Sequence, residues 1–176
     1  MFRGFDMRTP ILLLLNLSYL MIVSVVNSEI SPYVALVLPS IFIIPPALFL
    51  RLVPMSIVVS ISALLFEAFT DSRDCLICGI WLGFALFVRT IRFRFRSMDK
   101  FSLIALFEVI NFAVILLYML FLPKACDGIL DYLLRVFTDS LLSAAVLLFI
   151  GAYIVALPLS FFKVLKLSEK LSEDES

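Results

Sequence analysis

Two carboxylates lie inside long apolar segments of the sequence, where an ionised side chain is costly. Glu67 belongs to the apolar segment 52–70 and Glu108 to the segment 101–122. An ionisable residue in such a setting is by default a candidate functional residue. We expect Glu67 about one turn from one membrane surface and Glu108 about two turns from the other. Because these depths differ by more than ~10 Å, the two are not expected to form an acid/base pair.

Asn111 lies one helical turn after Glu108 and shares its face, so the two could contact another helix together. We favour a structural hydrogen bond within the membrane for Glu108, and either that or a position at the membrane surface for Glu67. Recognition of a ligand or a partner is the alternative for both residues.

The chain contains no histidine, which excludes histidine-based catalysis, haem ligation by histidine and most zinc sites. It also lacks a P-loop, a GxGxxG motif, an HExxH motif and clustered aspartates. We therefore expect a protein that is not an enzyme, with no catalytic residues, no cofactor and no metal. The net charge is zero, which gives no indication of a nucleic-acid partner.

Three cysteines could carry redox or metal chemistry. Cys75 and Cys78 form a CxxC pair, and Cys126 follows in the next loop expected on the same side of the membrane. A site with three thiols and no histidine is poor for zinc, and no strand precedes the pair as in thioredoxin-like sites. Small packing residues are the favoured interpretation; a structural disulfide remains open, and so does a redox role.

Composition indicates which elements must hold these residues. The chain is 63% hydrophobic and only 16% charged, whereas soluble domains are ~25% charged. A helix needs about 20 apolar residues to cross a membrane. We expect an all-α, polytopic membrane protein with a six-helix transmembrane bundle forming a single domain over 1–167, followed by a polar acidic tail over 168–176. The expected membrane-spanning segments are 10–27, 32–50, 52–70, 75–90, 101–122 and 140–162. Three internal prolines in the second segment, Pro39, Pro45 and Pro46, predict a kinked or split helix.

The distribution of positive charge predicts the orientation. With the N-terminus in the cytoplasm, eleven of the 14 Lys and Arg residues fall on the inner side and three on the outer side. Cytoplasmic loops are enriched in Lys and Arg, so both ends are expected inside. The basic segment 89–100 dominates this count and suits contact with anionic lipid headgroups. We expect the first apolar segment to stay as a membrane helix rather than act as a cleaved signal peptide.

Two further patterns concern packing. Gly79 and Gly83 form a GxxxG pair, which lets helices approach closely; packing within this chain is favoured over a dimer interface. In the segment 127–138, Leu130 and Leu133 belong to an apolar helical stripe opposite charged residues. We expect an amphipathic helix lying in the outer membrane interface, as a bilayer anchor or a docking surface for an extracytoplasmic partner.

The layout resembles the bacterial rod shape-determining protein MreD family. The similarity lies in an apolar segment with an acidic residue near its end, a short loop, a glycine-containing segment, a basic loop, and a last segment that ends in lysines. The residues that carry it are Ala63–Ser72 with Glu67, Gly79, Arg89–Arg96, Asp139–Ala145, Lys163 and Lys166. The resemblance implies a non-catalytic inner-membrane component of the cell-wall elongation machinery. It would help determine cell shape by binding an MreC-like periplasmic scaffold and wall-synthesis membrane proteins.

This layout is also similar to the six-helix substrate-binding subunits of energy-coupling-factor vitamin transporters. Such a subunit needs a deep outer cavity lined by Trp, Asn or Glu. The chain has one Trp, Trp81, and few polar residues in its apolar segments, which favours the scaffold interpretation.

Overall fold

The computed structural model describes residues 7–30, 35–70, 76–95, 100–121 and 129–164, and these residues form six helices and no strand. The helices are α1 (Arg8–Ile30), α2 (Pro39–Phe49), α3 (Leu52–Thr70), α4 (Leu76–Phe95), α5 (Lys100–Phe121) and α6 (Ile129–Val164). The expected all-α class is therefore confirmed for the described part of the chain.

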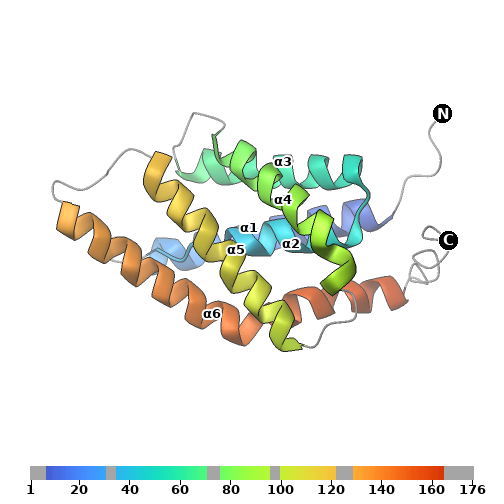
Figure 1. Ribbon diagram of the computed structural model, residues 1–176. Helices are drawn as coiled ribbons and strands as arrows, with labels where there is room; N and C mark the ends of the chain where they lie inside the picture. Colours follow the sequence, from blue (N-terminus) through green and yellow to red (C-terminus); the bar gives the residue numbers. More distant parts are fainter. Residues whose placement is uncertain (1–6, 31–34, 71–75, 96–99, 122–128, 165–176) are drawn as a thin grey trace.

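The short helix α2 lies at the centre of the bundle and contacts all five of the others (Figure 1). Nine of its 11 residues are buried. This follows from its sequence, which is apolar all round and carries no charged side chain, as expected of a helix buried on every side. The other helices run along it, with α3 and α4 on one side and α5 packed against α6.

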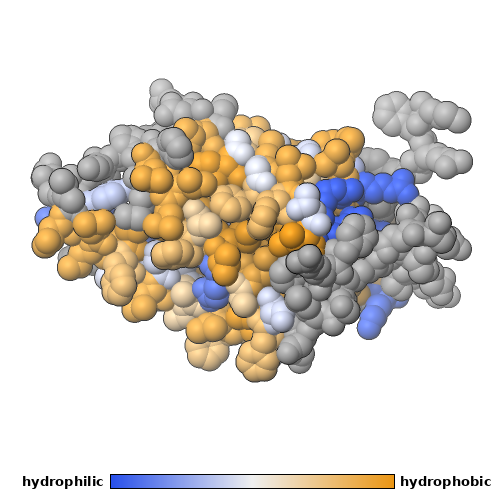
Figure 2. Space-filling view, viewed as in Figure 1, coloured by the Kyte–Doolittle hydropathy of each residue, from blue (hydrophilic) through white to orange (hydrophobic). Residues whose placement is uncertain are grey.

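Four helices are long and apolar enough to cross a membrane: α1, α3, α5 and α6. Their outward faces carry large exposed apolar side chains, and the visible face of the molecule is mostly hydrophobic (Figure 2). An apolar surface of this extent is not stable in water, so these features are those of a membrane protein.

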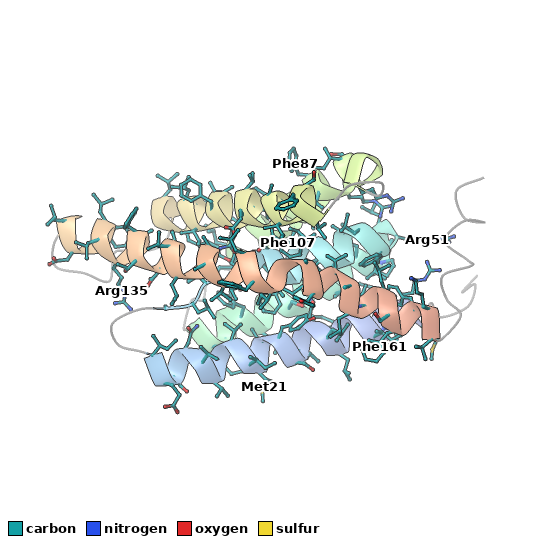
Figure 3. The ribbon with its side chains drawn as sticks, turned by 90° about the horizontal axis from the view of Figure 1, so that it is seen from below. Met21, Arg51, Phe87, Phe107, Arg135 and Phe161 are labelled. Atoms are coloured by element: carbon teal, nitrogen blue, oxygen red, sulfur yellow. The ribbon has the colours of Figure 1, made fainter. Side chains whose placement is uncertain are left out.

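Hydrophilic side chains gather toward one end of the bundle (Figure 2). Helix α1 begins at this end and α6 finishes there (Figure 1). Arg51 lies at the same end, together with Phe161, while Arg135 lies at the opposite end (Figure 3). Arg51 and Arg135, which were expected on opposite sides of the membrane, thus lie at opposite ends of the bundle.

Two expected elements differ from the structure. The second segment was expected to be helical from Pro32, but residues 35–38 are not helical and α2 begins at Pro39. The helix then continues through Pro45 and Pro46 to Phe49. The segment is therefore broken before Pro39, whereas the break predicted from Pro45 and Pro46 does not occur.

The last helix is longer than expected. The prediction of a separate amphipathic helix over 127–138 is wrong for its described part, because α6 runs without interruption from Ile129 to Val164. Residues 127 and 128 lie outside the described residues. At ~1.5 Å per residue, the 36 residues of α6 span about 54 Å, well beyond a hydrocarbon core of ~30 Å. The first turns of α6 accordingly project past the ends of α1 and α5 (Figure 1).

Candidate functional site

The break before α2 is held by side chains from α6. Two residues of α6, one turn apart, accept hydrogen bonds from the backbone of the non-helical segment. Asp139 Oδ1 accepts from the N–H of Ala35 at 2.8 Å, and Ser143 Oγ accepts from the N–H of Val37 at 3.0 Å. Asp139 and Ser143 are both buried. A stretch of non-helical backbone thus obtains its acceptors from a helix more than 100 residues away in sequence.

Helices α1 and α5 complete this arrangement. The side chain of Asn27 forms two hydrogen bonds with Leu36, donating to its carbonyl at 3.0 Å and accepting from its N–H at 2.7 Å. Asn111 Nδ2 donates to the carbonyl of Val37 at 3.1 Å, and Asn111 Oδ1 accepts from the hydroxyl of Ser40 at 3.3 Å. Irregular backbone inside a membrane protein is stable only when such partners satisfy it.

A side chain from another helix also replaces a missing backbone partner inside α2. Pro46 has no N–H, so the carbonyl of Phe42 lacks its usual helical donor. Asn16 of α1, which is 1% exposed, supplies one instead: its Nδ2 donates to Phe42 O at 3.2 Å and to Ser62 Oγ at 3.0 Å. One amide side chain thereby joins α1, α2 and α3 and compensates for a proline within the helix.

The far end of α2 is capped by a cation. Arg89 of α4 donates from a guanidinium nitrogen to the carbonyl of Leu50 at 2.7 Å. Carbonyl groups at a helix C-terminus lack intrahelical partners and carry partial negative charge, so an arginine is favourable there. Arg89 is one of the basic residues that the sequence assigned to lipid headgroups, and the structure gives it this additional role.

Stacked aromatic rings fill the space between α2 and α4. Trp81 is fully buried and stacks on Phe42 with ring centroids 5.3 Å apart and an interplanar angle of 8°. Phe66 packs against the same indole at 5.4 Å. The indole N–H of Trp81 donates to the hydroxyl of Tyr118 on α5. The single tryptophan therefore belongs to the packed core that joins four helices.

Glu67 also has a hydrogen-bond partner within the chain. It is 4% exposed, and its Oε1 accepts a hydrogen bond from the N–H of Cys78 at 3.1 Å. Cys78 is the third residue of α4, where backbone N–H groups lack intrahelical acceptors and a carboxylate is favourable. Glu67 thus caps α4 from α3. Cys78 is a free thiol, while Cys75 and Cys126 lie outside the described residues.

Glu108 differs from the other acidic residues inside the bundle. Its Oε1 is buried and has no hydrogen-bond partner. Asn111, which was expected to act with it, bonds to the segment before α2 instead. The structure therefore brings Asn111 into the polar arrangement around α2 and leaves Glu108 out of it.

Two packing predictions concern exposed positions. Gly79 and Gly83 were expected to pack within the chain, but both are exposed, and a Cβ added at either would meet nothing within 4 Å. That prediction is wrong, because α4 turns this face outward. Leu130 and Leu133 are exposed, as a partner-binding stripe requires, but they lie on the projecting start of α6.

The sequence analysis missed the residues that hold α2. Asn16, Asn27 and Ser143 were not named as candidates, and Asp139 was named only for the family resemblance. Asn16 and Ser143 are polar residues flanked by apolar ones. That isolation is the signal that could have identified them, since a polar side chain in a membrane helix needs a partner.

Among the described residues, no group of three or more His, Cys, Asp or Glu side chains is placed to hold a metal ion. Apart from Glu108, the polar side chains discussed above bind the chain's own backbone and one another. Comparison with known proteins adds no relative, since no family model, curated protein or solved structure matches this chain.

Proposed function

We propose that this chain is a non-catalytic, multi-pass component of the bacterial cytoplasmic membrane that takes part in cell-wall elongation. In this proposal it crosses the membrane six times, keeps both ends in the cytoplasm, and binds an MreC-like periplasmic scaffold and wall-synthesis membrane proteins. The family resemblance of the sequence supplies the biological process. The structure supports a binding role without turnover.

The dimensions of the second segment support six crossings. Helix α2 has 11 residues, too few to cross alone; at ~1.5 Å per residue it spans about 16 Å. The four non-helical residues before it add up to ~13 Å. Together they approach the ~30 Å of a hydrocarbon core. Helix α4 has 20 residues, and its arginines lie near its C-terminal end, where they can reach headgroups.

The observation that carries the proposal is the use of the buried polar side chains. Asn16, Asn111 and Asp139 bind the chain's own backbone around α2, and the single tryptophan is enclosed by aromatic rings. A vitamin-binding subunit would need such groups free to face a ligand cavity. Because these side chains hold the chain's own backbone and core instead, they favour a rigid bundle that binds partners through its surface.

The projecting start of α6 is the surface we assign to an extracytoplasmic partner. If Lys163 marks the inner membrane surface, about 20 residues of helix cross the core and roughly the first 15 residues of α6 extend beyond it. Their exposed apolar side chains recur at helical spacing: Leu130, Leu133, Leu134 and Phe137. A narrow apolar stripe of this kind, outside the membrane, fits against a helix of the scaffold protein.

Depletion of the protein in a rod-shaped host tests the proposal, with round cells as the expected result.

The partner surface is tested by introducing a charge into the apolar stripe. Leu133→Glu should reduce co-purification of the scaffold, because Leu133 lies at the centre of the stripe and is 52% exposed. Arg135→Glu, on the opposite side of the same helix, is the matched control and should leave co-purification unchanged. Normal cell shape after depletion, with co-purification of a transporter ATPase or saturable binding of a vitamin, would contradict the proposal and establish an uptake subunit.

A further inference from the structure

Glu108 stands apart from Glu67 and Asp139, the other two acidic side chains described inside the bundle. Glu67 accepts a hydrogen bond from α4, and Asp139 accepts one from the segment before α2. Glu108 Oε1 is shielded from the surroundings but bonded to nothing. A buried acceptor without a donor is costly, and the cost is greater in a membrane interior than near water.

The depth of Glu108 removes lipid headgroups as donors. It lies eight residues after Lys100, where α5 begins, which corresponds to ~12 Å along the helix. The half-thickness of the hydrocarbon core is about 15 Å. A headgroup amine at the surface would therefore remain far from this carboxyl group, and lipid tails offer no donor at all.

The neighbouring surface of α5 can accept another helix. Val109 and Phe112 are 63% and 56% exposed, and the small residue Ala105 is exposed one turn before Glu108. Small residues allow close approach of a second helix in a membrane. Glu108 itself is partly exposed and lies at the edge between this outward face and the buried face of α5. A helix packed against Ala105 and Phe112 would thus lie beside the exposed part of the Glu108 side chain.

We propose that Glu108 is the contact point for a transmembrane helix of a different membrane protein, which carries a lysine or arginine at the same depth. This inference rests on the proposed function, in which the chain binds membrane partners. Charge complementarity identifies the cation, since an intramembrane carboxylate is stabilised by an opposite charge.

Within the part of the chain that the structure describes, a second copy offers no available charge at that depth. The basic residues of the described part of the chain lie between helices or toward the helix ends: Arg8, Arg51, Arg89, Arg92, Arg94, Lys100, Arg135 and Lys163. Arg89 comes closest to the depth of Glu108, six residues before the end of α4, but its guanidinium already donates to the carbonyl of Leu50. Arg135 lies on the projecting start of α6, at the opposite end of the bundle (Figure 3). The partner is therefore a different protein.

Photo-crosslinking in living cells tests this contact. A photoreactive phenylalanine analogue is placed at Val109 or Phe112, and at Met21 as a control. Met21 is 60% exposed on α1, on the side of the bundle away from α5 (Figure 3). Val109 and Phe112 should yield one adduct with a membrane protein, and Met21 should not. Glu108→Ala should lower the adduct yield by roughly tenfold or more, because the cation would be left buried without its partner.

A charge exchange makes the test specific. Glu108→Lys should abolish the adduct, and replacing the partner's lysine or arginine with Glu should restore it. Elution of each variant as a folded species on size exclusion separates loss of contact from loss of fold. An adduct unaffected by Glu108→Ala, an adduct with a second copy of this chain, or crosslinking to lipid alone would overturn the inference.

The outcomes also separate this inference from the proposed function. A Glu108-dependent adduct with a membrane protein unrelated to wall synthesis would retain the contact and contradict the role in cell-wall elongation. Round cells on depletion without any Glu108-dependent adduct would retain that role and contradict the contact.

Discussion

Replacing Asn16 with leucine tests whether a side chain compensates for the proline in α2. Leucine has a similar size but no donor, so the carbonyl of Phe42 would lose its bond from Asn16, and Pro46 has no N–H to replace it. An unsatisfied buried acceptor costs ~1–3 kcal/mol, while polar contacts between membrane helices average ~0.6 and reach ~1.7 kcal/mol. We therefore expect Asn16→Leu to lower the free energy of unfolding by about 1–2 kcal/mol.

The same substitution made in a Pro46→Ala background isolates the cause. Alanine restores a backbone N–H that can donate to Phe42 O, so Asn16→Leu should cost about 1 kcal/mol less there than in the original chain. The free energy of unfolding is measured by steric trapping in bicelles for all four members of the cycle. Ser18→Ala is the control, because Ser18 is exposed on the same helix and bonds only to the carbonyl of Leu14. Equal losses in the two backgrounds would refute the role of Asn16 at Phe42.

Three further substitutions follow from the same contacts, each measured as the free energy of unfolding. Asp139→Asn keeps an oxygen acceptor for the N–H of Ala35 and should be tolerated, whereas Asp139→Leu should cost ~1–3 kcal/mol; equal losses would refute the acceptor role. Glu67→Gln should likewise retain the cap on α4, and Glu67→Leu should cost about 1 kcal/mol. Gly151→Ala should stabilise the protein by about 0.5–1 kcal/mol through helix propensity, because its Cβ would meet α5 only at 3.9 Å; a clear loss would show tighter packing than the structure has.

Hydropathy predicted the simple helices closely. The expected segments 52–70 and 101–122 correspond to α3 (Leu52–Thr70) and α5 (Lys100–Phe121). In these helices every backbone bond forms within the segment, so local sequence is sufficient to define them. The apolar pattern also identified Glu67 and Asn111 as polar residues that need partners.

The break before α2 could not be located in this way. Its position depends on Asp139 and Ser143, which approach from a helix more than 100 residues further along the chain. Asn27 and Asn111 add partners from two more helices. A run of apolar residues gives no indication of such tertiary bonds, so residues 35–38 were expected to be helical. The length of α6 was missed for a related reason, because Asp131 and Arg135 were interpreted as the polar side of a separate surface helix.

The orientation of α6 across the membrane is the most direct test of the account, since the partner surface depends on it. Single cysteines at Asp131 and Lys163, introduced after replacing the three native cysteines with serine, are treated with a membrane-impermeant maleimide in intact cells. Both positions are exposed, at opposite ends of α6. We expect labelling of the Asp131→Cys variant in intact cells and labelling of the Lys163→Cys variant only after the membrane is permeabilised. Labelling of Lys163→Cys in intact cells with protection of Asp131→Cys would contradict this orientation.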